Sequence, residues 1–163
     1  MTPADLQYLR RAIALSGEAR RSGKHPFAAI VVAADGSVLS EAGNNSLPPA
    51  GDPTQHAELR AAQMAYRSGS APQLAGATLY TSAEPCAMCS GAIYWCGIGR
   101  VVYALSEESL LRLTGDHPEN PTFSLPCREV FARGQRKVEV EGPALEEDAS
   151  AAHLGFWQRD TTA

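Results

Sequence analysis

Three short predicted strands, separated by segments with helical patterning, constrain the fold of this chain most strongly. They cover residues 27–33, 77–82 and 100–105. The first is apolar almost throughout, which is typical of a strand buried on both faces. Apolar residues at spacings of three and four predict a first helix over residues 3–22. Strands that alternate with helices indicate a layered α/β fold.

Turn residues predict how the sheet continues. Asp35-Gly36 is a hairpin signal, so residues 38–42 are expected to return antiparallel to the first strand. The sheet is therefore expected to be mixed. A final strand is expected over residues 137–140.

Start signals place the remaining helices. Asp52 is expected to cap a helix that has Pro53 in its first position and runs to about residue 67. Pro85 is expected to open a helix to about residue 96, and Ser106 to cap a short one. Two further helices are expected, over residues 127–133 and 144–158.

Composition limits the class of protein. With 44% hydrophobic and 20% charged residues and no repeat or linker, the chain is expected to form a single domain over residues 1–163. No apolar run approaches the roughly 20 residues that span a bilayer. The N-terminus has the pattern of an amphipathic helix and lacks that of a signal peptide. We therefore expect a cytoplasmic protein without a membrane partner.

The charge balance argues against a long nucleic acid as partner. The net charge is −4 and the isoelectric point about 5.5, whereas binding to long nucleic acids normally needs a basic stripe. Basic residues near the N-terminus are interpreted as a solvated helix face. The acidic C-terminal region would repel phosphates. A small, weakly charged substrate is expected.

Two clusters carry the chemistry. His56-Ala57-Glu58 and Pro85-Cys86-Ala87-Met88-Cys89 each lie where a helix is expected to begin. A CxxC pair alone would also suit a redox protein or a zinc ribbon, but a second CxxC is absent and His56 and Glu58 have no use in a redox pair. The combination matches the H-x-E and P-C-x-x-C signature of zinc deaminases. The other cysteines, Cys96 and Cys127, are interpreted as small buried hydrophobic residues.

The spacing explains why these residue types suit Zn²⁺. Cys86 and Cys89 lie three apart, on one face of a helical turn whose N-terminus favours thiolates. With His56 they make three protein ligands and leave one tetrahedral position open, as in catalytic zinc sites. Glu58 is predicted to be the general base that moves protons from water to the ring nitrogen and the leaving amine.

At these residues the sequence resembles the cytidine deaminase-like superfamily. The resemblance implies a three-layer α/β/α fold with a five-stranded mixed sheet, and assembly as a homodimer. It is detailed over residues 27–105, where several motifs look most like those of bacterial guanine deaminases: Pro26-Phe27, Gly43-Asn44-Asn45, Asp52-Pro53-Thr54, His56-Ala57-Glu58, Tyr80-Thr81-Ser82, Glu84-Pro85-Cys86 and Gly91-Ala92-Ile93-Tyr94-Trp95.

Roles for substrate-binding residues follow from this resemblance. Phe27 would line the base pocket, Asn44 would hydrogen-bond the base, the backbone at Ala57 would meet a ring carbonyl, and Trp95 would form an aromatic wall. Phe27 and Trp95 could equally be core residues.

Two regions that govern substrate choice depart from the guanine deaminase pattern. Residues 106–126 do not align, and Asp116 is predicted to lie near the pocket mouth, although His117-Pro118 could simply start a turn. At the C-terminus, Phe156 and Trp157 resemble the aromatic lid of several family members, so Trp157 is expected to contact the substrate.

The implied reaction is hydrolysis of guanine to xanthine and ammonia. A cytosine or nucleoside deaminase remains open as an alternative with the same chemistry. A tRNA adenosine deaminase is disfavoured by the acidic C-terminal region. A non-catalytic zinc module that binds a partner has no use for Glu58.

Overall fold

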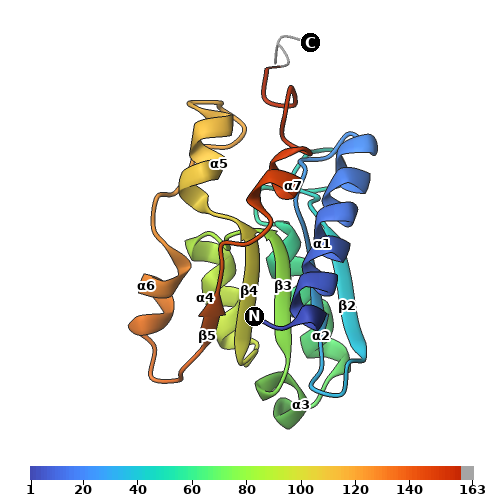
Figure 1. Ribbon diagram of the computed structural model, residues 1–163, viewed down its shortest axis with the longest axis vertical. Coiled ribbons are helices and arrows are strands. Elements are labelled where there is room, and N and C mark those ends of the chain that lie inside the picture. The colour runs from blue at the N-terminus through green and yellow to red at the C-terminus, as the bar shows by residue number, and fades with distance from the viewer. Residues whose placement is uncertain (159–163) are drawn as a thin grey trace.

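The computed structural model describes residues 1–158, which form a five-stranded mixed sheet between two layers of helices (Figure 1). The strands are β1 (Ala28–Val32), β2 (Val38–Gly43), β3 (Thr78–Ala83), β4 (Arg100–Leu105) and β5 (Glu139–Glu141). Their order in the sheet is β2-β1-β3-β4-β5. β1 is antiparallel to both of its neighbours, whereas β3, β4 and β5 are parallel. The predicted three-layer α/β/α fold is confirmed.

Helices cover both faces of this sheet. One face carries α1 (Pro3–Arg21) and α7 (Glu146–Ser150). The other face carries α2 (Ala57–Ser68), α4 (Ala87–Trp95) and α6 (Cys127–Ala132), as Figure 1 shows. Two short helices flank the parallel strands: α3 (Ala71–Ala75) leads into β3, and α5 (Glu107–Thr114) follows β4.

Alternate strand residues supply two separate cores. Val31 and Val101 pack beneath α2 and α4, whereas Ile30 and Val102 face α1. All four side chains are fully buried. Because both faces are covered, these strands are apolar throughout instead of alternating with polar residues.

The strand directions bring several loop residues to one edge of the sheet. β1 begins where β2, β3 and β4 end. Phe27, Asn44, Glu84 and Ser106 directly flank these strand ends. α2 and α4 begin at the same edge, which therefore gathers most of the chain's predicted site residues.

The helix expected to start after Asp52 starts instead at Ala57. The Asp52 carboxylate accepts a hydrogen bond from the backbone N–H of Thr54 at 2.8 Å and closes a separate turn. His56 then keeps an extended backbone, with φ −66° and ψ 153°, directly before the helix. The prediction of Asp52 as helix cap was therefore wrong.

The C-terminal helix expected over residues 144–158 was wrong in extent. α7 ends at Ser150, and residues 151–158 form a chain of turns that we call the C-terminal strap. Arg20 of α1 donates hydrogen bonds to the carbonyls of Ala151 and Ala152, at 3.4 and 3.0 Å. Gly155 has a φ of 69°, a left-handed conformation that does not continue a helix.

The other predicted elements agree with the structure to within about two residues. Ser106 caps α5 as expected, because its hydroxyl accepts from the backbone N–H of Ser109 at 3.2 Å. α3 was not predicted. Within residues 1–158, no helix has both the length and the apolar character needed to cross a membrane.

Candidate active site and metal centre

Three potential metal ligands meet where α2 and α4 begin. His56 precedes α2, Cys86 precedes α4, and Cys89 lies in the first turn of α4. Their ligand atoms all lie within 4.8 Å of one another, and Cys86 Sγ is 3.7 Å from His56 Nδ1. Cys89 is buried and the other two are half-buried. The fold thus unites two clusters that are 30 residues apart in sequence.

The first turn of α4 positions both sulfur atoms. The backbone N–H of Ser90 donates to the Cys86 carbonyl at 2.8 Å, so the two cysteines lie on one side of the turn. A hydrogen bond from Cys89, and a further one with His56, lowers the pKa of Cys86 to about 4. Donation to Cys86, together with burial, raises the pKa of Cys89. The Cys86 sulfur is therefore a thiolate near neutral pH, which is the metal-binding form.

This donor set fits zinc. One imidazole nitrogen and two sulfur atoms are the ligands that zinc prefers, and their mutual distances suit a single ion. Three protein ligands leave the fourth tetrahedral position for a reactant, which distinguishes a catalytic site from a closed structural one.

Glu58 lies beside the three ligands without being one of them. Its side chain is buried, with 5% exposed. The Thr81 hydroxyl donates to Glu58 Oε1 at 2.6 Å, and Cys89 Sγ lies 3.5 Å from Oε2. Burial raises the pKa of Glu58. A carboxyl group in this position can both accept and return a proton, as a general acid–base residue must.

A small cavity of about 40 Å³ connects these groups with residues from the sheet edge. Its lining residues come from six different segments: Phe27, Asn44, His56, Glu58, Ala83, Glu84, Cys86, Leu110 and Asn120. A wider groove of about 550 Å³ shares His56, Cys86 and Asn120 with the cavity and is bordered by residues 118–123. The candidate site is thus a narrow inner cavity that opens into an outer groove.

The predicted substrate-binding residues Phe27 and Asn44 both line the inner cavity. The amide oxygen of Asn44 accepts from the backbone N–H and the hydroxyl of Ser46, both at 2.8 Å. The Nδ2 group is therefore the part of this amide left for a ligand. Ala57, the first residue of α2, is buried between His56 and Glu58.

Three other predicted contacts lie elsewhere. Trp157 is buried in the C-terminal strap, with its ring centroid 6.1 Å from that of Phe27 and 5.4 Å from that of His117. Asp116 is exposed and does not border the inner cavity. Trp95 is 82% exposed at the end of α4 and also does not border the cavity.

Sequence reasoning missed two polar residues of the cavity. Glu84 was predicted only to belong to a family motif, yet its carboxylate accepts from the backbone N–H groups of Glu107 and Cys127, at 3.1 and 3.0 Å. It therefore holds the starts of α5 and α6 next to the cavity. Asn120 lies in the 114–126 loop, where no periodicity could indicate which side chain points inward.

Comparison with known proteins identifies the family. Residues 2–105 match the family model described as the cytidine and deoxycytidylate deaminase zinc-binding region. The chain belongs to this family. The zinc-binding deaminase domain and the His-Cys-Cys group together make the protein a zinc-dependent deaminase, a hydrolase that acts on a C–N bond.

Individual relatives of this deaminase differ in their named substrates. A probable cytosine deaminase of Schizosaccharomyces pombe is 44% identical over 96% of this chain and 94% of its own length. The guanine deaminase of Bacillus subtilis is also 44% identical, over 60% of this chain and 62% of its own length. A solved structure in complex with 2,6-diaminopurine has a TM-score of 0.76 and 25% identity, over 96% of this chain and 82% of that one.

Proposed function

We propose that this deaminase removes the exocyclic amino group of a free nucleobase by hydrolysis. The first candidate substrate is guanine, which would give xanthine and ammonia. The observation that carries the proposal is the inner cavity, which joins His56, Glu58 and Asn44. A guanine deaminase among the relatives and an aminopurine bound to a similar structure support a purine.

The lining of the inner cavity favours a free base over a nucleoside or RNA. Phe27 and Leu110 bound it with apolar surface, which suits the face of one flat ring system. The C-terminal strap adds Trp157 against Phe27. A ribose would have to extend past these side chains into the outer groove. The net charge of −4 also argues against RNA.

Each residue then has a role. His56, Cys86 and Cys89 hold zinc, which when bound supplies a Lewis acid that makes water nucleophilic near neutral pH. Glu58 transfers one proton of the attacking water to the ring nitrogen and the second proton, from the hydroxyl group then on the ring carbon, to the departing amine. Asn44 Nδ2 donates to an acceptor atom of the base.

The balance of the reaction is that of a hydrolysis. One C–O bond forms at the amino-bearing ring carbon as water adds, and the C–N bond at the same carbon breaks. The amino group leaves as ammonia with one proton delivered by Glu58, the ring nitrogen keeps the other water proton, and the ring carbon becomes a carbonyl carbon. No oxidant or reductant is required.

Cytosine is the second candidate substrate. It is favoured by the relative that is 44% identical over almost the whole chain and is named a probable cytosine deaminase. The same zinc ligands, Glu58 and Asn44 would serve this smaller ring without change.

The test is ammonia release from guanine, cytosine, adenine, guanosine, cytidine and a tRNA anticodon stem. We expect turnover of guanine, loss of at least about 1,000-fold in Glu58→Gln, and normal turnover in Glu18→Gln, which changes an exposed glutamate of α1. Turnover of cytosine alone would replace guanine by the second candidate. Turnover of the anticodon stem alone would overturn the free-base proposal.

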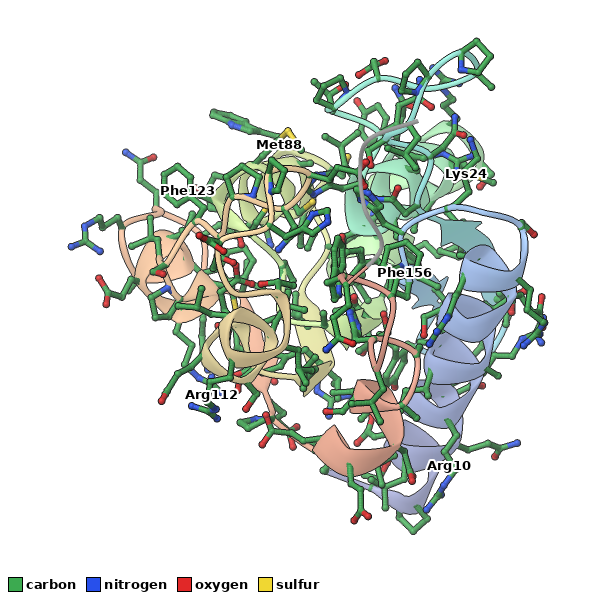
Figure 2. All side chains as sticks on the ribbon, turned by 90° about the horizontal axis from the view of Figure 1, so that it is seen from above. Arg10, Lys24, Met88, Arg112, Phe123 and Phe156 are labelled. Carbon is green, nitrogen blue, oxygen red and sulfur yellow. The ribbon has the colours of Figure 1, made fainter. Side chains whose placement is uncertain are left out.

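We also propose that the chain forms a homodimer through the exposed side of α4. Three large apolar side chains are exposed on this side: Met88 at 37%, Trp95 at 82% and Phe123 at 61%. Figure 2 shows Met88 and Phe123 on the side of the molecule away from Arg10. Exposed apolar patches of this kind mark association sites. Sedimentation should give a dimer that dissociates in Trp95→Ala but persists in Val38→Ala, an exposed control on β2.

A further inference from the structure

A buried histidine that the proposed reaction does not use lies beside the candidate site. His25 is 4% exposed, in the segment between α1 and β1, and it borders the outer groove. Its ring lies 5.1 Å from that of Trp157 and 5.9 Å from that of Phe156, measured between centroids. Phe156 lies near the centre of the view in Figure 2. Packing against both rings fixes the directions of the two imidazole nitrogens.

One nitrogen leads to the base-binding amide. His25 Nδ1 is 3.3 Å from the Ser46 hydroxyl, which in turn lies 2.8 Å from Asn44 Oδ1. The backbone N–H of Ser46 also donates to this oxygen. Because a backbone N–H can only donate, the oxygen of the Asn44 amide must face Ser46, and Nδ2 is left for the cavity.

The other nitrogen leads to the loop across the groove. His25 Nε2 is 3.0 Å from Glu119 Oε2. Glu119 is followed directly by Asn120, which lines the inner cavity. The loop turns back on itself here, since the backbone N–H of Asn120 donates to the His117 carbonyl at 3.0 Å. The position of Glu119 therefore sets that of Asn120.

We propose that His25 is a positioning residue that joins the Asn44 amide on one wall of the site to the Glu119–Asn120 segment on the other. The contacts of His25 with Ser46 and Glu119 are present without substrate. Only their expected effect on KM rests on the proposed function. Through one rigid ring, the orientation of the amide and the placement of the loop are set together. The base is then recognised by two polar groups held at a fixed separation.

The two arms of the linkage can be separated by substitution. An Asn side chain places its amide where Nδ1 of histidine lies, whereas a Gln side chain reaches the position of Nε2. His25→Asn is therefore expected to keep the contact with Ser46 and lose that with Glu119. His25→Gln is expected to do the reverse, and His25→Ala to lose both.

Amide hydrogen exchange without substrate tests the linkage directly. In His25→Ala we expect exchange about tenfold faster both at the Ser46 amide and over residues 118–122. His25→Asn should accelerate only the loop, and His25→Gln only Ser46. His117→Ala, which removes another ring against Trp157, should leave the Ser46 amide unchanged. Unchanged exchange at Ser46 in His25→Ala would overturn the proposal.

Kinetics with the base identified by ammonia release then tests the consequence. We expect His25→Ala to raise KM about tenfold and to change kcat less than about threefold, as for loss of one positioned hydrogen bond. His25→Ala/Ser46→Ala should be no worse than His25→Ala alone. If His25→Ala and Ser46→Ala instead raised KM independently, so that their factors multiplied in the double variant, His25 would not act on Asn44 through Ser46. Failure of the wild type to release ammonia from any base would sink the proposed function, while the exchange result would still decide the linkage.

Discussion

The Asp5 carboxylate, near the start of α1, accepts two hydrogen bonds from the guanidinium of Arg100, the first residue of β4, at 2.8 and 2.9 Å. The Tyr80 hydroxyl donates to the same carboxylate at 2.8 Å. Asp5 is buried, and Arg100 also contacts Glu141 of β5. These contacts fasten the first helix across β3 and β4, the two central parallel strands that lead to the site.

Replacing Asp5 by Asn should lower the free energy of unfolding by about 2 kcal/mol, because the Arg100 guanidinium loses its charged hydrogen bonds to Asp5 while it keeps the contact with Glu141. Urea unfolding would measure the change. Asp35→Asn is the matched control, since Asp35 is exposed in the β1–β2 turn and should change stability by less than about 0.5 kcal/mol. Equal losses in the two variants would contradict a specific role of the buried pair.

The same ion pair predicts a dependence on pH. The Arg100 guanidinium holds the pKa of the Asp5 carboxyl well below its usual range. A lowered folded pKa stabilises the protein above the unfolded pKa, and this stabilisation is lost as pH falls through the folded value. The difference in unfolding free energy between wild type and Asp5→Asn should therefore be constant above about pH 5 and shrink below about pH 4. A difference that grows on acidification would refute this.

Local spacing was enough to predict that Cys86 and Cys89 lie side by side at a helix start. Cys86 and Cys89 lie within one helical turn, and a helix start needs only a few residues to define it. The apolar runs over residues 27–33 and 101–105 likewise predicted β1 and β4, because strands buried on both faces need apolar residues throughout. The partner of this cysteine pair, His56, depended on the motif, since only the fold brings α2 beside α4.

Other features depend on contacts that spacing does not encode. Asp52 has the composition of a helix cap, but its carboxylate closes a turn with Thr54 instead. The C-terminal strap leaves the helical path because Arg20, more than 130 residues away in sequence, binds its carbonyls. The 114–126 loop reaches the cavity through Asn120 and not through the predicted Asp116, because His25 holds Glu119.

Zinc content should distinguish Cys89 from Cys96, which lies outside the metal group. Cys89→Ser is expected to reduce zinc from about one ion per chain to nearly none, because a serine hydroxyl is a poor zinc ligand. Cys96→Ser, at the end of α4 and outside the metal group, should retain the metal. Elemental analysis after gel filtration gives the stoichiometry. Full zinc content in Cys89→Ser would refute the ligand assignment.

Removal of the metal by a chelator should lower the melting temperature, and zinc should restore it. The reason is that binding to the folded form alone adds to its stability by mass action. The Cys96→Ser protein serves as the control and should respond like the wild type. If the melting temperature stayed the same after zinc had been shown to be lost, the metal would not connect the starts of α2 and α4.

The C-terminal strap should detach in acid because of His153. Trp157 Nε1 donates to His153 Nδ1 at 3.1 Å, and the buried Nε2 has no hydrogen-bond partner among residues 1–158. Burial lowers the pKa of His153 to about 4. Since the ordinary value is about 6.5, the packed strap is fully stable above that pH and loses up to about 3 kcal/mol as pH falls towards 4. His25, whose pKa burial also lowers, faces the same indole.

Trp157 fluorescence can follow this release if Trp95→Phe removes the exposed second tryptophan. We expect a red shift with its midpoint between about pH 4 and 6.5. His153→Gln keeps an acceptor for the indole N–H but removes the titrating ring, so the shift should move to lower pH. His25→Gln should move the transition less, because the Glu119 carboxylate partly counteracts the lowering of the His25 pKa by burial. An identical transition in His153→Gln would show that another group releases the strap.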